Sequence, residues 1–158
     1  SQMLLLGEKA SSLEEARKMV LDTLQSGRSW DQFRKLVVNQ GGDVSCVDDP
    51  KKLARAKFIE TIAAPRSGYL KEINAQTVGE TSVELGAGRV KKSDVIDPAV
   101  GIIIHHKVGD ALQKGDALFT IHANDEEKLA NARERLLGAH LWSDEKVEPL
   151  PLFYGVIK

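Results

Sequence analysis

The sequence predicts an α+β protein in which a helical segment comes first and a small β domain follows. Residues 12 to 40 carry apolar side chains at helical spacing, whereas residues 58 to 121 hold short β-prone runs between Gly and Pro turns. A further helical stretch begins near residue 124, and an extended tail follows it. We therefore expect a helical segment, then a small β barrel-sandwich hybrid with a C-terminal helix and strand.

The helices of the first 42 residues are predicted from their ends. Ser12 with Glu15 forms a capping-box pattern, and Ser29 with Gln32 repeats it. Glycines close the helices at three places: Gly7, Gly27 and the pair Gly41–Gly42. Because the first residues resemble the end of a helix, we expect the chain to be the C-terminal portion of a longer protein.

Three large apolar side chains of these helices, Met19, Trp30 and Phe33, are expected in a core rather than around a cofactor. Arg34 and Lys35 are the basic residues of the second helix, too few for DNA reading. Residues 43–57 lose periodicity and form the expected linker to the domain of residues 58–158.

The β domain is predicted from short runs with turn residues on either side. Expected strands cover residues 58–63, 68–73, 101–105 and 117–121, with shorter strand pieces marked by Val78, Val83 and Leu85. Residues 124–127 resemble the cap of a last helix, and residues 140–158 are expected to extend and dock back onto the domain.

Composition excludes several classes of partner. The 22 Lys and Arg residues balance 23 Asp and Glu residues, so no basic field attracts nucleic acid. Apolar runs are far shorter than the roughly 20 residues that cross a bilayer. The single cysteine, Cys46, forms no internal disulfide. We expect a cytoplasmic protein with neither nucleic acid nor membrane as a partner.

Two turn-rich segments, residues 64–70 and 107–121, resemble the barrel-sandwich or hammerhead domains that carry biotin or lipoate on a lysine. At the position of that lysine this sequence has Asp125, and Lys128 falls within the predicted last helix. A structural copy without a carrier lysine is therefore the main interpretation. A carrier or binding module of the hammerhead type is the alternative.

Metal and nucleophile patterns are weak. His105 and His106 are adjacent, so on a strand they point to opposite faces, and with His122 they match no standard zinc spacing. Asp94 and Asp97 are expected to be solvated loop residues. We predict no metal site, no cofactor and no catalytic residue within the chain.

One loop suggests more than solvation. Residues 86–92 combine Gly86 and Gly88 with three cations, of which Arg89 is the first. No helix follows to direct amides at an anion, so a mobile solvated loop is one interpretation. The other is a flap, built on Gly86, Gly88 and Arg89, that docks against a neighbouring domain or an anion and could close a cleft.

Taken in order, the motifs resemble the C-terminal third of the pyrimidine-nucleoside phosphorylases, the bacterial family that includes thymidine phosphorylase. The resemblance rests on Gln2–Leu4, Gly41–Asp43, Ala64–Gly68, Leu85–Arg89, Asp97–Gly101 and the turns of residues 108–116. The Gly-Ala-Gly-Arg loop between the two hammerhead halves is the most specific of these.

The resemblance implies an enzyme with a helical, an α/β and a hammerhead domain, with residues 1–42 belonging to the α/β domain. Its reaction is the reversible phosphorolysis of pyrimidine nucleosides to free base and pentose 1-phosphate. The family's Lys-His-Ser-Thr-Gly-Gly phosphate motif and its base-binding residues do not occur in these 158 residues. We therefore expect the chain alone to be inactive, to carry no substrate-binding or metal residue, and to belong to a homodimer formed through the helical domain.

Overall fold

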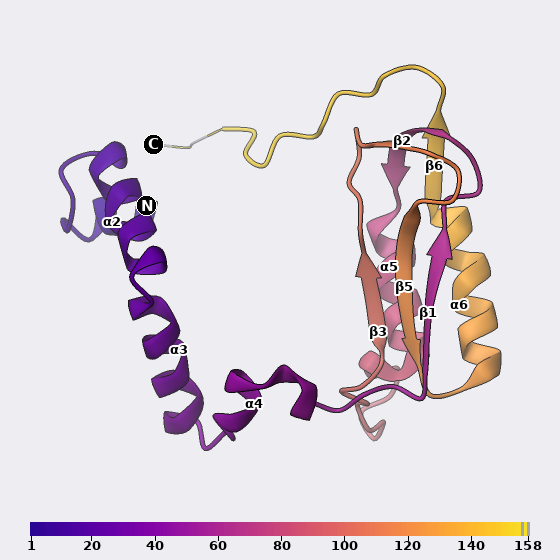
Figure 1. The fold of residues 1–158 in the computed structure, drawn as a ribbon, viewed down its shortest axis with the longest axis horizontal. Coiled ribbons are helices and arrows are strands. Elements are labelled where there is room, and N and C mark those ends of the chain that lie inside the picture. The colour runs from indigo at the N-terminus through magenta and orange to yellow at the C-terminus, as the bar shows by residue number, and fades with distance from the viewer. Residues whose placement is uncertain (156, 158) are drawn as a thin grey trace. The chain divides into compact units, whose positions relative to one another are not determined.

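The computed structural model describes residues 1–155 and 157. The chain divides into two compact units, an N-terminal unit of Ser1–Leu53 and a C-terminal unit of Ala54–Lys158. The division falls inside the stretch 43–57 that we interpreted as a linker. This stretch also contains two short helices, α4 (Ser45–Asp48) and η1 (Pro50–Lys52). Figure 1 shows the helical character of the first unit and the mixed character of the second.

The N-terminal unit consists of α1 (Gln2–Leu6), α2 (Leu13–Gln25), α3 (Arg28–Asn39) and the two short helices. At the start of α2 the Ser12 hydroxyl accepts from the Glu15 amide at 3.1 Å, as predicted. The Glu15 carboxylate accepts instead from the amide and hydroxyl of Ser11, at 2.8 and 2.6 Å. These contacts lower the pKa of Glu15, with the Ser11 hydroxyl as the larger cause.

The predicted cap at Ser29 is wrong. Helix α3 starts at Arg28, two residues earlier than a cap at Ser29 implies, and its N-cap is Gly27, which has φ of +79° and supplies no side-chain cap. A left-handed glycine turns the chain from α2 into α3 without a separate capping residue. The end of α3 is a Schellman motif, in which Gly42 N donates to Val37 O and Gly41 N to Val38 O, both at 2.9 Å.

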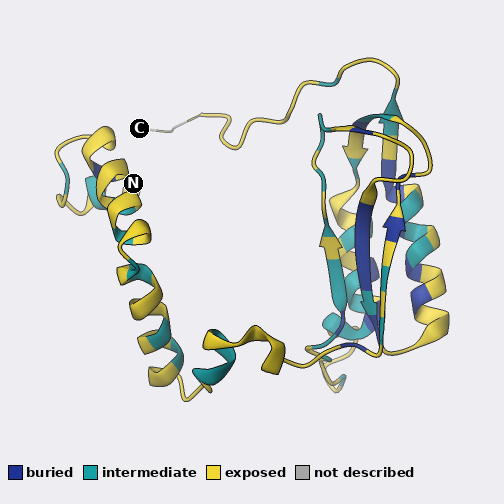
Figure 2. Ribbon diagram, viewed as in Figure 1, coloured by how far each residue is buried: buried dark blue, intermediate teal, exposed yellow. Residues whose placement is uncertain are grey.

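Few side chains are buried in the N-terminal unit. Ala16 is its one fully buried hydrophobic residue among those described, and Figure 2 shows mostly exposed helices. The prediction of a core is wrong for Met19, Trp30 and Phe33, which are 39%, 49% and 46% exposed. The apolar residues do lie on helices α2 and α3, as their spacing predicted. However, the described part of this unit has no second layer of structure against which the apolar faces of these helices could pack.

The C-terminal unit contains two three-stranded antiparallel sheets. One has the order β1 (Phe58–Ala63), β5 (Ala117–Ala123), β3 (Gly101–Ile104). The other has the order β4 (Ala111–Leu112), β2 (Gly68–Ile73), β6 (His140–Ser143). The α+β class is confirmed. The described strands form these two separate sheets and not a closed barrel.

Helices α5 (Ala75–Ser82), η2 (Val83–Ala87) and α6 (Glu126–Ala139) complete the unit, with α5 against α6 (Figure 1). The predicted strand pieces at Val78, Val83 and Leu85 are wrong, because these residues lie in α5 and η2. Asn74 is the N-cap of α5, since its Oδ1 accepts from Thr77 N at 3.0 Å. The sequence did not indicate α5 because its β-branched residues and Gly79 have a low helix propensity.

Strand β5 forms the centre of the core, and Figure 2 shows it buried along most of its length. Leu118, Phe119 and Ile121 are fully buried, and they join Leu70 of β2 and Leu136 of α6 in one cluster. Both sheets and the last helix thus contribute to a single core, which holds the connecting loops in place.

The predicted docking of the tail is confirmed in part. Strand β6 pairs with β2, and Pro149 lies so close to Gly109 that a Cβ there would come within 2.9 Å of the proline backbone. Leu150 is 63% exposed, and Leu152, Phe153 and Tyr154 are at least 84% exposed. Residues 156 and 158 are outside the described part. Helices long and apolar enough to cross a membrane are absent from the described residues.

Candidate functional site

The candidate site is the loop that connects η2 to β3, residues 88–100. We interpreted its first residues either as a solvated loop or as a flap. Gly86 and Gly88 shape its start in different ways. Gly86 has φ of +118°, a conformation that residues with a Cβ rarely adopt. Gly88 has an ordinary extended backbone, but a Cβ there would lie 2.7 Å from Val83 Cγ2. Gly86 is therefore needed because of its backbone conformation, and Gly88 because a larger side chain would overlap Val83.

Asp97 fixes the other end of the loop. Its amide donates to Gly86 O at 2.9 Å, which closes the loop on itself. Its Oδ1 accepts from Ala99 N at 2.9 Å and its Oδ2 from Asn124 Nδ2 at 2.7 Å. The Ala99 amide, and then Asn124, lower the pKa of Asp97 because both donate to the charged carboxylate.

The tip of the loop is a turn organised by Asp94. Its Oδ2 accepts from Val90 N at 3.1 Å and from Lys91 N at 2.8 Å, and its own amide donates to Lys91 O. The side chains at the tip are exposed, with Val90 at 75% and Val95 at 89%. The tip therefore combines a defined backbone with outward-facing side chains.

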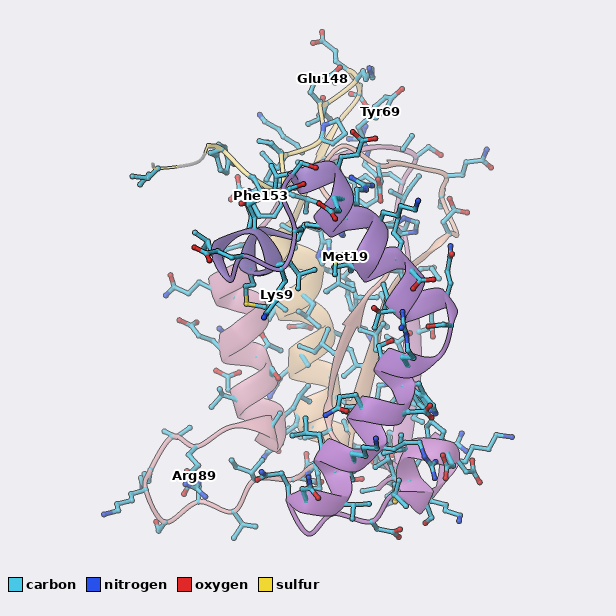
Figure 3. All side chains as sticks on the ribbon, turned by 90° about the vertical axis from the view of Figure 1, so that its left-hand side faces the viewer. Lys9, Met19, Tyr69, Arg89, Glu148 and Phe153 are labelled. Carbon is cyan, nitrogen blue, oxygen red and sulfur yellow. The ribbon has the colours of Figure 1, made fainter. Side chains whose placement is uncertain are left out.

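Arg89 lies on this exposed part and has no ion pair or side-chain hydrogen bond with any described residue. Figure 3 shows it on a loop that extends from the end of the unit opposite to Tyr69 and Glu148. The arginine, with Lys91 and Lys92, gives the loop a positive charge that the described part of the chain leaves available. Such a loop can contact an anion or an acidic surface.

The position of a carrier lysine is occupied by a helix start. Asp125 is the N-cap of α6, and its Oδ1 accepts from Lys128 N at 2.9 Å. Lys128 lies in the first turn of this helix and not at a hairpin tip. The geometry here is that of a helix terminus and lacks the exposed hairpin on which a prosthetic group could swing.

The histidines have separate partners. His105 Nε2 lies 2.8 Å from Thr120 Oγ1, and that hydroxyl lies 2.8 Å from Thr61 Oγ1. His106 Nδ1 is 3.5 Å from a carboxylate oxygen of Asp110. Within the described residues, no group of three or more His, Cys, Asp or Glu side chains is placed to hold a metal ion.

Sequence reasoning missed the role of Asp97 and Asn124. Asp97 was expected to be a solvated charge, yet it accepts two hydrogen bonds. The order Asp-Pro-Ala was an available signal, because Asp side chains commonly accept from the amide two residues on. For Asn124 the sequence held no comparable signal, since its partners Asp97 and Lys57 are far away in the chain.

The fold and the loop together define an α+β protein of two units, with a cationic loop on the second unit and a helix cap where a carrier would have its lysine. Residues 69–140 match the pyrimidine nucleoside phosphorylase C-terminal domain. The chain belongs to the pyrimidine-nucleoside phosphorylase family, and its similarity includes the C-terminal domain of that family.

Several proteins named pyrimidine-nucleoside phosphorylase are similar over 127 residues, or 80% of the chain. One from Staphylococcus epidermidis is 46% identical, one from Geobacillus stearothermophilus 48% and one from Staphylococcus aureus 41%. The chain spans 29% of the length of these curated relatives.

Proposed function

We propose that this chain is the C-terminal part of a pyrimidine-nucleoside phosphorylase. The complete enzyme phosphorolyses uridine- or thymidine-type nucleosides to free base and pentose 1-phosphate, and it acts in cytoplasmic nucleoside salvage. The observation that carries the proposal is the 41–48% identity to enzymes of that name. The residues that bind phosphate and base are assigned to the part of the longer protein that precedes this chain. The complete enzyme is proposed to be a homodimer.

Residues 1–42 of the N-terminal unit are proposed to be part of the neighbouring α/β domain of that longer protein. Support comes from an apolar hollow of about 490 Å³ within this unit. Trp30, Phe33 and Val37 of α3 line it together with Val47 and Leu53. A half-exposed apolar surface of this kind is stabilised when another layer of the protein covers it.

The C-terminal unit is proposed to be a hammerhead that has lost the carrier function. Its two small sheets and the turns at Gly109 and Gly115, both with positive φ, support the relation to biotinyl and lipoyl domains. The cap at Asp125 argues against an attached prosthetic group. The loop built on Gly86, Gly88 and Arg89 is proposed to order over the cleft of the enzyme when substrate binds.

A phosphorolysis assay tests the assignment of the chemistry. The 158-residue chain is expected to release no uracil or thymine from uridine or thymidine in the presence of phosphate. The complete enzyme, assayed in parallel, is expected to release the base. Turnover by the chain alone would show that the reacting groups lie within it.

Intact mass separates this proposal from the carrier alternative. After co-expression with a biotin or a lipoate ligase, the chain is expected to keep its unmodified mass. A known carrier domain expressed with the same ligase is the positive control. Addition of one biotinyl or lipoyl group to a lysine of the chain would favour the carrier function instead.

A further inference from the structure

Two side chains link the candidate loop to the start of the C-terminal unit. Asn124 uses both ends of its amide: Nδ2 donates to Asp97 Oδ2 at 2.7 Å, and Oδ1 accepts from Lys57 N at 2.7 Å. Asp97 in turn holds Gly86 O through its own amide. The linked positions are 27 and 67 residues apart in the chain, so the fold alone brings them together.

The place of Lys57 gives this contact its significance. Lys57 comes four residues after Leu53, the last residue of the N-terminal unit, and directly before β1. Its amide thus lies where the chain enters the C-terminal unit. We propose that Asp97 and Asn124 are positioning residues that form a relay, through which the order of the loop and the order of the entry segment 54–57 change together.

The Asn124 side-chain amide can satisfy both of its partners in only one orientation. The Asp97 carboxylate can only accept, so it requires the Nδ2 side of Asn124 to face it. That orientation places Oδ1 toward Lys57, whose amide is a donor. Rotating the Asn124 amide by half a turn would bring two acceptors together at Asp97 and two donors together at Lys57, and both contacts would be lost at once.

The consequence is a connection between the order of the loop and the order of the segment that joins the units. When Asp97 leaves its place, Asn124 loses the contact that orients it, and Lys57 loses its acceptor. The relay is independent of the proposed phosphorolysis, because it consists of contacts within one unit. Its test accordingly needs no catalytic activity.

Amide hydrogen exchange, measured residue by residue on the 158-residue chain, provides that test. Asp97→Ala removes a carboxylate that has no hydrogen bond with Lys57, yet it is expected to accelerate exchange at the Lys57 amide about three- to tenfold. Asn124→Ala is expected to do the same and to accelerate exchange at Val90 and Lys91. Asn131→Ala is the matched control, since Asn131 is an exposed asparagine of α6 whose side chain forms no hydrogen bond with the described residues.

The amides of β5 report on unfolding of the whole unit and should keep their wild-type rates. If exchange at the β5 amides is also faster in Asp97→Ala, the milder variant Asp97→Asn is used to test the relay. Its side chain retains an oxygen that can accept from Ala99 N, but it presents an NH2 group to Asn124. Acceleration at Lys57 in that variant, with β5 unchanged, supports the relay. Wild-type exchange at Lys57 in both Asp97 variants would overturn it.

Discussion

The imidazole of His140 stacks on the ring of Phe119, with the ring centroids 5.2 Å apart and the planes inclined by 24°. His140 Nδ1 donates to Leu136 O at 2.6 Å, while Nε2 is buried and has no partner among the described residues. A proton on Nε2 would therefore be a buried charge without a hydrogen-bond acceptor.

The free energy of unfolding should fall as the pH drops from the pKa of His140 in the unfolded chain toward its lower pKa in the folded chain. Burial lowers the pKa of His140 in the folded chain, against the weaker opposing effect of the Leu136 carbonyl. Below an unfolded pKa of about 6.5 the unfolded chain binds more protons, so the free energy of unfolding decreases until the lower folded pKa is reached. The slope should not exceed about 1.4 kcal/mol per pH unit.

Urea unfolding between about pH 5 and pH 8 measures this slope. His140→Gln is the comparison, because glutamine keeps an amide donor for Leu136 O and does not titrate. The contribution of His140 is the difference between the two slopes. Identical slopes for the wild type and the variant would show that the imidazole does not govern stability in this range.

Alanine should destabilise the chain at both loop glycines, but for different physical reasons. Gly86→Ala is expected to cost about 1–3 kcal/mol, because a Cβ is strained at φ of +118°. Gly88→Ala is expected to cost a similar amount, about 1–3 kcal/mol, because its Cβ would overlap Val83. Adding Val83→Ala should relieve the Gly88 variant and leave the Gly86 variant unrelieved. Equal effects of Val83→Ala in both backgrounds, measured by urea unfolding, would contradict this distinction.

Asp125 should matter as a helix cap. Asp125→Ala removes the acceptor of the Lys128 amide and is expected to destabilise the chain by about 0.5–2 kcal/mol. Asp125→Ser is the matched control, because serine also caps helices well. Thermal unfolding distinguishes the two variants. A loss in Asp125→Ser as large as that in Asp125→Ala would mean that the carboxylate has another role.

The contacts of α6 with β1 and the core should differ in strength. Arg133 Nε donates to Glu60 Oε1 at 3.0 Å, but both side chains are over one-third exposed, so Arg133→Ala should cost less than about 1 kcal/mol. Leu136 is fully buried, and Leu136→Ala should cost about 2–5 kcal/mol. Added salt should reduce the effect of the first change only. Unfolding curves at low and high salt test both expectations.

Arg89 should act on catalysis and not on stability. In the complete enzyme, Arg89→Ala is expected to raise KM or lower kcat for nucleoside phosphorolysis, because the loop that we propose to close over the cleft would lose a positive charge. Lys71→Ala, which removes an exposed cation of β2, is the control. If the Arg89 variant matches the wild type in both constants, the loop serves only to connect η2 with β3.

Local patterns predicted much of the C-terminal unit. The bounds expected for β1 and β2 agree with those observed, and the cap expected near residue 124 lies at Asp125. These elements have strong local signals, namely glycine turns, alternating side chains and an N-capping acid. Helix α5 was missed because its cap, Asn74, precedes β-branched residues and a glycine, which favour other structures.

The sequence by itself determined the α+β class, the resemblance to the phosphorylase family and the absence of a lysine at the carrier position. Only the tertiary structure decided what anchors the loop. The hydrogen bonds from Asn124 to Asp97 and from Lys57 to Asn124 join residues that are distant along the chain. Such contacts depend on how strands and helices pack, and no local periodicity records them.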